Sequence, residues 1–144
     1  MADIPSEMKG IVSIDSDLDD DYLFNLTSRV PIIGAFDLEN TNITDEGIKR
    51  ISKVKNVEKL ELKNSRQITK NCQPYIDTLK ELVVLNLMKT SITLDDVMVL
   101  KELQNLKELY MSSDKDEDYN LEKIIEMKVI LPNCIVYVNY ETLE

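Results

Sequence analysis

The chain has 144 residues, of which 43% are apolar and 31% charged, and this is long enough for one domain with a buried core. Its net charge of −10 repels phosphate backbones and anionic lipids, so neither nucleic-acid binding nor membrane binding is expected. No apolar run approaches the length of about 18 residues that a membrane span needs. The N-terminal segment MADIPSEMKG lacks the basic start and apolar stretch of a secretory signal, which predicts a cytoplasmic protein.

The residue types that are missing limit the chemistry of this chain. It contains no histidine and only two cysteines, Cys72 and Cys134, so Ser-His, Cys-His and His-metal sites cannot be built. The three glycines, Gly10, Gly34 and Gly47, are scattered and form no phosphate-binding loop. We therefore expect no metal, no cofactor and no catalytic residues, and we expect both cysteines to be buried free thiols.

A short apolar pattern recurs along the chain at almost constant spacing. It has the form apolar–x–x–apolar–x–apolar. The copies are Ile33–Phe36–Leu38, Val57–Leu60–Leu62, Leu82–Leu85–Leu87, Leu106–Leu109–Met111 and the weaker Leu131–Cys134–Val136. Counting back one more period from the first copy gives Val12 and Ile14 the second and third positions. A regular period in the mid-twenties is typical of a solenoid, with one short strand in each coil.

Each apolar pattern is followed by a turn and then by helical spacing. A hydroxyl residue stands at the ninth position of the first three copies, as Thr41, Ser65 and Thr90. An Ile-Thr pair follows, and its threonines are predicted helix N-caps: Thr44, Thr69 and Thr93. Apolar residues then recur every three or four positions in 48–54, 76–79 and 97–103, which predicts one helix per coil.

The flanks fit the same plan less closely. Residues 1–30 are predicted to form an N-terminal coil or cap, residues 31–129 the repeats, and residues 130–144 a C-terminal strand cap. In the fourth repeat a charged loop, DKDEDYN, precedes the helical stripe that begins at Leu121. The whole chain is thus predicted to be one α/β domain of about five to six coils. Its parallel strands would lie on the concave face and its helices on the convex face.

Three segments carry a family resemblance. IGAFDLENTNITDEGIKRIS, VEKLELKNSRQITKN and LVVLNLMKTSITLDDVMVL resemble leucine-rich repeats of the form LxxLxLxx(N/T)xI, and the resemblance covers residues 33–111 well. It implies a leucine-rich-repeat solenoid of the small bacterial type. A short, acidic repeat protein without a second module also resembles bacterial immunity proteins, which neutralise a toxin by covering it.

The predicted strands present residues to the concave face between their inward positions. The middle column reads Asp37, Glu61, Asn86, Tyr110 and Ile135. The flanking columns are Glu39, Lys63, Met88, Ser112 and Tyr137 on one side, and Ala35, Lys59, Val84 and Glu108 on the other.

Within this array one group of apolar and aromatic residues is predicted to form an exposed cluster suited to a protein interface: Val84, Met88, Tyr110, Ile135 and Tyr137. The alternative is that some of them pack under the C-terminal cap. The predicted partner-binding residues are Asp37, Glu39, Glu61, Lys63, Val84, Asn86, Met88, Glu108, Tyr110, Ser112, Ile135 and Tyr137.

Two acidic segments follow predicted strands and are expected at the same edge of the molecule. They form a predicted acidic rim of Asp15, Asp17, Asp19, Asp114, Asp116, Glu117 and Asp118. Such a rim could steer a basic partner, although solvated loops and acidic helix starts explain it equally well. The alternating aspartates do not form a calcium loop, because Asp20 and Leu26 replace the Gly and Glu that an EF-hand requires.

A binding module therefore fits this sequence better than an enzyme. Asp37 and Glu61 on adjacent strands could serve as paired carboxylates, but beside Lys59 and Lys63 on an open face no pocket is expected to shift their pKa values. The leading hypothesis is an immunity protein that binds another protein, a basic toxin or effector, as a monomer or in a heterodimer. The alternative is an adaptor or scaffold subunit that holds a regulatory protein on its concave face.

Overall fold

The structure, a computed structural model, describes residues 6–140 and has a mixed α/β fold with two parallel sheets and four α-helices. The strands are β1 (Glu7–Met8), β2 (Ile11–Val12), β3 (Ile32–Ile33), β4 (Ala35–Asp37), β5 (Lys59–Glu61), β6 (Val84–Asn86), β7 (Glu108–Met111) and β8 (Ile135–Val138). The helices are α1 (Asp20–Arg29), α2 (Asp45–Ile51), α3 (Gln73–Ile76) and α4 (Glu117–Ile130). Two 3-10 helices, η1 (Lys70–Cys72) and η2 (Asp96–Val99), complete the described elements. The outer parts of the two predicted caps, 1–5 and 141–144, lie outside the described residues.

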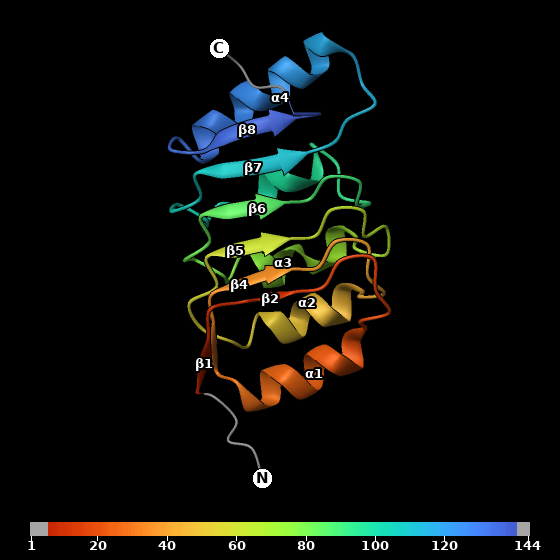
Figure 1. The fold of residues 1–144 in the computed structure, drawn as a ribbon. Helices are drawn as coiled ribbons and strands as arrows, with labels where there is room; N and C mark the ends of the chain where they lie inside the picture. Colours follow the sequence, from red (N-terminus) through yellow and green to blue (C-terminus); the bar gives the residue numbers. More distant parts are fainter. Residues whose placement is uncertain (1–5, 141–144) are drawn as a thin grey trace.

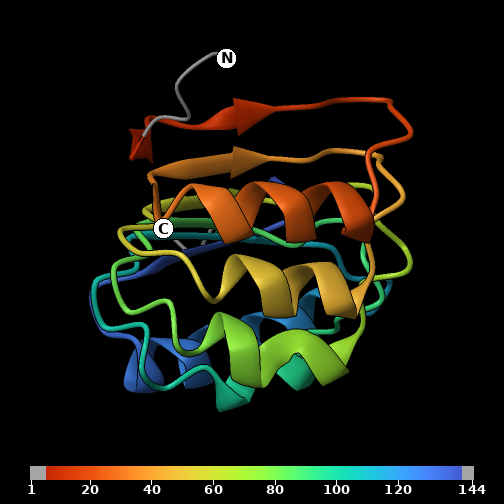
Figure 2. The ribbon, with the colours of Figure 1, turned by 90° about the horizontal axis from the view of Figure 1, so that it is seen from below.

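The larger sheet has six parallel strands in the order of the chain, β2-β4-β5-β6-β7-β8, while β1 and β3 form a separate pair. Successive strands lie beside one another from the N-terminal to the C-terminal end of the molecule (Figure 1). The helices lie on one side of this sheet (Figure 2). The opposite side has no helix over it among residues 6–140, and we call it the open face.

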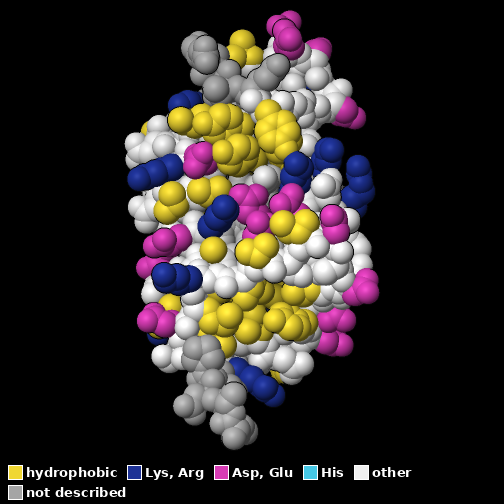
Figure 3. Space-filling model, viewed as in Figure 1, with side chains coloured by type: hydrophobic (Ala, Val, Ile, Leu, Met, Phe, Trp, Pro, Cys, Tyr) yellow, Lys and Arg dark blue, Asp and Glu magenta, His cyan; other side chains and the backbone are white. Residues whose placement is uncertain are grey.

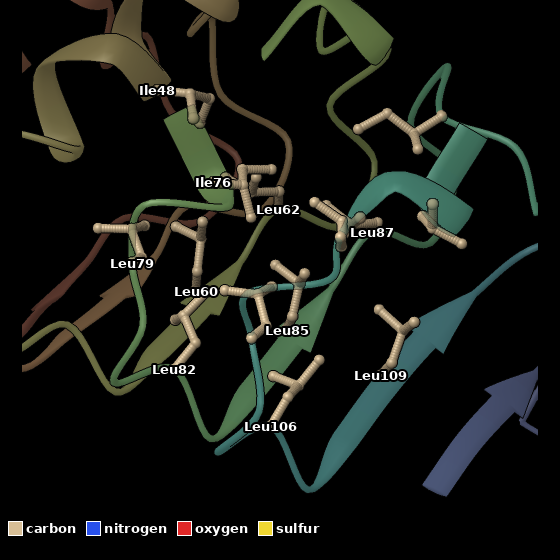
Figure 4. Packing of buried hydrophobic residues seen from close by; sticks show 14 of the residues in the cluster. Ile48, Leu60, Leu62, Ile76, Leu79, Leu82, Leu85, Leu87, Leu106 and Leu109 are labelled. Carbon is tan, nitrogen blue, oxygen red and sulfur yellow. The ribbon is translucent and has the colours of Figure 1, made fainter. Parts of the chain in front are cut away.

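The core lies between the sheet and the helices. The central residues of three neighbouring strands, Leu60, Leu85 and Leu109, are in register and fully buried. Their side chains point toward the helix side, where Ile76 of α3 and Leu79 pack near them (Figure 4). Burying each such side chain contributes about 1.5–3 kcal/mol relative to leaving it in water. The predicted inward positions of the four strong copies are thereby confirmed.

The strands end in a recurring left-handed turn, which the sequence pattern did not reveal. The backbone φ is positive at Asp15, Asn40, Asn64, Lys89 and Asn139, each shortly after a strand of the larger sheet. Asn and Asp tolerate this conformation better than most residues, which explains their frequency at these positions. The amides of Asp15, Asn40 and Asn64 each donate to a carbonyl in the next loop, at 3.0 Å. The resulting row of linked turns, at the C-terminal ends of the strands, is the loop edge.

Two of the three predicted threonine caps are confirmed. The Thr44 and Thr69 hydroxyls accept from the backbone amides of Glu46 and Asn71 and begin α2 and η1. Thr93 differs, because the residue preceding η2 is Asp95 and makes no capping bond with its side chain. Thr93 instead exchanges two hydrogen bonds with Asp96.

The predicted register of the first strand is wrong by one residue. Ile11 pairs with Phe36 and Val12 with Asp37, so the first unit is one residue longer than predicted. Because side chains alternate along a strand, this shift moves Val12 and Ile14 from the core side to the open face. They are 72% and 47% exposed.

The predicted register of the last strand is also wrong, by two residues. Glu108 pairs with Ile135 and Tyr110 with Tyr137, so the last unit is two residues longer than predicted. The loop after β7 and the 14-residue helix α4 account for this greater length. Tyr137 therefore occupies the middle row of the open face, and Ile135 occupies a flanking row beside Glu108.

Candidate protein-binding face

The open face carries three rows of side chains, set by the strand register. The middle row is Val12, Asp37, Glu61, Asn86, Tyr110 and Tyr137. One flanking row is Ala35, Lys59, Val84, Glu108 and Ile135. The residues two positions after the middle row form the other: Ile14, Glu39, Lys63, Met88 and Ser112. The structure thus brings the predicted partner-binding residues onto one surface, with Ile135 and Tyr137 in different rows from those predicted.

The C-terminal half of the open face is built around a pair of stacked tyrosines. The Tyr110 and Tyr137 rings are 4.7 Å apart between centroids and inclined by only 9°. The Tyr110 hydroxyl donates to Glu108 Oε1 at 2.8 Å, and this bond, with burial, raises the pKa of Tyr110 to about 12. Ile135 beside them is 42% exposed. We call Val84, Tyr110, Ile135 and Tyr137 the tyrosine patch; hydrophobic side chains gather over β7 and β8 in the upper part of Figure 3.

Met88 does not belong to the exposed cluster, contrary to the prediction, and the predicted partner-binding residue Asn86 is buried as well. They are 2% and 8% exposed. The Asn86 side chain turns back to accept a hydrogen bond from the Met88 amide at 3.0 Å. Lys63 Nζ donates to the Tyr140 hydroxyl at 2.5 Å, and since β6 and β7 lie between these residues, the bridge passes across the row in which Met88 stands.

The central part of the open face is charged. Asp37, Glu39 and Glu61 lie on the adjacent strands β4 and β5 and the turn that follows β4, and Glu61 contacts Lys59 Nζ at 3.7 Å. Burial and the neighbouring Asp37 carboxylate raise the pKa of Glu39, and the nearby Lys63 only partly opposes this. One oxygen of Asp37 is buried without a hydrogen-bond partner. Negative charge is therefore incompletely compensated in this region.

The predicted acidic rim is divided into two parts. Its segments follow β2 and β7 at the same loop edge, but four strand spacings of about 4.8 Å place them roughly 19 Å apart. The basic residues Arg66 and Lys89 follow the intervening strands β5 and β6. The side chains of Asp19 and Asp116 accept backbone hydrogen bonds at the starts of α1 and α4. These two residues thus serve as helix caps, as the alternative interpretation of the rim expected.

The two cysteines and the paired carboxylates are the other residues that the sequence analysis singled out. Cys72 and Cys134 are buried free thiols, and burial raises the pKa of both. Asp37 and Glu61 are neighbours in register on β4 and β5. Within residues 6–140, His, Cys, Asp and Glu form no group of three or more that could hold a metal ion. None of the helices in that range is long and apolar enough to cross a bilayer.

Sequence reasoning missed three exposed residues of this surface. Val12 and Ile14 were assigned to the core, and only knowledge of the register places them outside. Tyr140 was treated as part of the cap, although it contacts Lys63 across the open face and its ring centroid lies 5.3 Å from Lys63 Nζ. The adjacent polar pair Asn139-Tyr140, with positive φ at both residues, was the available signal of a turn. Neither a protein-family model nor a curated protein matches this chain.

Proposed function

We propose that the chain is a leucine-rich-repeat solenoid of five to six coils whose open face binds another protein without catalysing a reaction. Three repeating features support the solenoid: the strands follow one another in chain order, their registers advance by an almost constant step from β2 to β7, and the left-handed turns recur with them. A rigid sheet of this kind is a preorganised surface, which lowers the entropy cost of association.

The observation that carries the binding proposal is the tyrosine patch. Two stacked, partly exposed aromatic rings and the neighbouring Ile135 form apolar surface on a face that no described helix covers. Tyrosines supply large contact areas at low conformational cost and are enriched among residues that dominate binding energy. Their charged neighbours would form the polar rim that such interfaces have around an apolar centre.

The proposed partner is a basic protein, and its proposed class is a toxin or effector that this chain neutralises in the cytoplasm. The net charge of −10 favours encounter with a cationic surface. The carboxylates of Asp37, Glu39 and Glu61 lie on the same face as the tyrosine patch, on β4, β5 and the turn after β4, and would offer sites for Lys or Arg side chains of the partner. Covering the active surface of the partner would suffice to inhibit it, so no catalytic residue is required of this chain.

The binding proposal is tested by isolating a partner from the native host and measuring the affinity of the purified pair. The double variant Tyr110→Ala/Tyr137→Ala should weaken that affinity at least about a hundredfold, because two central aromatic residues are removed. The matched control is Tyr22→Ala/Phe24→Ala, which removes two exposed aromatic residues from α1. Equal affinities of the tyrosine-patch variant and the wild type would reject the open face as the binding site.

The toxin-neutralising role needs its own readout. Expression of the captured partner alone should arrest growth, and co-expression of this chain should restore it. The Tyr110→Ala/Tyr137→Ala variant should restore growth less well than the wild type. A partner that binds through the same face but is neither toxic nor inhibited would reject neutralisation and favour the adaptor role.

A further inference from the structure

The loop edge contains a second feature, which borders the open face at Ser112. A hollow of about 680 Å³ lies between the loops that follow β6 and β7. Most of its lining residues are polar, and they include Arg66, Lys89, Lys115, Ser112 and Thr93. This volume lies within the range of small-ligand sites in proteins, and the C-terminal ends of parallel strands are a common location for them.

The hollow exists because the loop after β7 leaves the regular stack. Elsewhere along the edge, loops are tied directly to the preceding loop: the Asn42 amide donates to the Leu18 carbonyl and the Ser91 amide to the Ile68 carbonyl, both at 2.9 Å. The loop after β7 keeps one side-chain hydrogen bond to the loop after β6, from the Lys89 amide to Ser112 Oγ, and then turns to the C-terminal side, where Ser113 and Asn139 exchange two hydrogen bonds. The two loops separate beyond Ser112, and this separation opens the space.

Positive charge converges on this space from three successive loops. Arg66 follows β5, Lys89 follows β6 and Lys115 follows β7, and none of them takes part in the ion pairs found among residues 6–140. Of the two carboxylates in the lining, Asp95 is already bound to Lys123 at 2.8 Å and to the Tyr119 hydroxyl. Asp114 is the other. A locally basic hollow is unusual on a protein with a net charge of −10.

Two hydroxyl groups in the lining can donate a hydrogen bond to a ligand. Ser112 Oγ accepts from the Lys89 amide at 3.1 Å, and Thr93 Oγ1 accepts from the Asp96 amide at 3.2 Å. Neither hydroxyl donates to another described residue, so each retains a hydrogen for a further acceptor. A ligand in the hollow would therefore meet cationic and hydroxyl donors together.

We propose that this hollow binds a phosphate-sized oxyanion, either a free phosphate ion or a phosphate ester. Arg66 supplies a planar, multidentate donor, while Lys89 and Lys115 supply point charges, which is the usual chemistry of phosphate recognition. Ser112 and Thr93 contribute neutral donors. Asp114 at the border limits the negative charge that the site accepts, which favours a compact anion over an extended polyanion.

The test is a titration of the full chain with inorganic phosphate at constant ionic strength, followed by NMR at the amides of Lys89, Ser112 and Ser113. We expect saturable shifts that the double variant Arg66→Gln/Lys115→Gln weakens at least about tenfold, since each cation contributes charge-assisted hydrogen bonds. The matched control is Lys101→Gln/Lys107→Gln, which changes the net charge equally at exposed lysines outside the hollow. The control should bind like the wild type.

A parallel titration with glycerol 2-phosphate separates the two sources: tighter binding than phosphate identifies an ester, and weaker binding identifies the free ion. Shifts that rise linearly without saturation for both ligands overturn the proposal. Equal weakening in the test and control variants also overturns it, because the effect is then one of net charge alone. Either failure leaves the tyrosine patch unaffected, since the affinity for a protein partner is measured separately.

Discussion

The N-terminal and C-terminal halves of the molecule share one sheet but differ at its loop edge. In the N-terminal half, Asp20 accepts hydrogen bonds from the Thr44 amide and hydroxyl, and Asp45 does the same for Thr69 one unit later. The next position in this series is Lys70, which cannot accept, and the Thr93 amide turns to Asp96 within its own loop. The repeated backbone therefore keeps this hydrogen-bonded link between units only where an aspartate recurs at the equivalent position.

The open face shows a second contrast, between its charged centre and its apolar C-terminal end. Charged side chains occupy its central strands, whereas the tyrosine patch occupies β7 and β8 with Val84 of β6 (Figure 3). The strands beneath are alike in length and direction, so these differences come from the outward residues alone. The hollow and the tyrosine patch lie in the C-terminal half, while Val12 and Ile14 expose apolar surface at the N-terminal end of the same face.

The largest effect on stability is expected from removing the hydrogen bonds between Asp45 and Thr69, which link two units in the N-terminal half. Asp45→Ala leaves the Thr69 amide and hydroxyl without their acceptor, which should lower the free energy of unfolding by about 1–3 kcal/mol. Asp96→Ala, in the C-terminal half, removes a bond within one loop and should cost less. Urea unfolding monitored by circular dichroism measures both values. A larger loss for Asp96→Ala would contradict the greater structural weight of the aspartate–threonine bonds between units in the N-terminal half.

A smaller effect is expected from the left-handed turns. Lys89 has φ of 55°, a conformation that costs a residue with a Cβ about 1 kcal/mol, so Lys89→Gly should stabilise the protein by about 0.5–1 kcal/mol. Asn64→Gly at φ of 64° should change stability less, because Asn already tolerates this region. Thermal unfolding of the two variants provides the comparison. Destabilisation by Lys89→Gly would show that the Lys89 side chain has a structural role.

The smallest effect concerns the charged part of the open face. Because the pKa of Glu39 is raised in the folded protein, the folded state binds more protons than the unfolded state between the two pKa values. The contribution of Glu39 to the free energy of unfolding therefore falls as the pH rises through that interval. Glu39→Gln should be more stable than the wild type at pH 7 and equally stable below the ordinary Glu pKa of 4.5. Urea unfolding across this pH range checks the sign, which a destabilised variant at pH 7 would contradict.

The sequence predicted the strands best where the repeats are uniform. The spacing of Leu60, Leu85 and Leu109 was sufficient to place them inward, because successive units there differ in length by only one residue. The last strand failed for the same reason in reverse: the unit before Ile135 is longer, and no apolar pattern at that point reveals how many residues the loop absorbs. The first strand failed because its unit is one residue longer than the step that was counted back. A one- or two-residue error then misplaces a whole strand.

The candidate site was predictable only in part. Tyr110 and Tyr137 were identified as outward residues, but their stacking depends on a register that the pattern gave wrongly. Met88 was expected to be exposed because it alternates outward, but it is 2% exposed, and alternation cannot reveal contacts across the face such as that between Lys63 and Tyr140, which are 77 residues apart in the chain. The hollow arises from the departure of a single loop, for which the sequence offers only the acidic insertion as a signal.

Hydrogen–deuterium exchange on the complex with a captured partner tests most directly whether the open face is the binding surface. In the free protein and the complex, amide exchange would be compared for peptides covering the strands and for those covering the helices. We predict added protection in β6, β7, β8 and the segment around Lys63 to Asn64, with α1, α2 and α3 unchanged. Protection confined to the helices, with the strands unchanged, would show that the partner binds the opposite side.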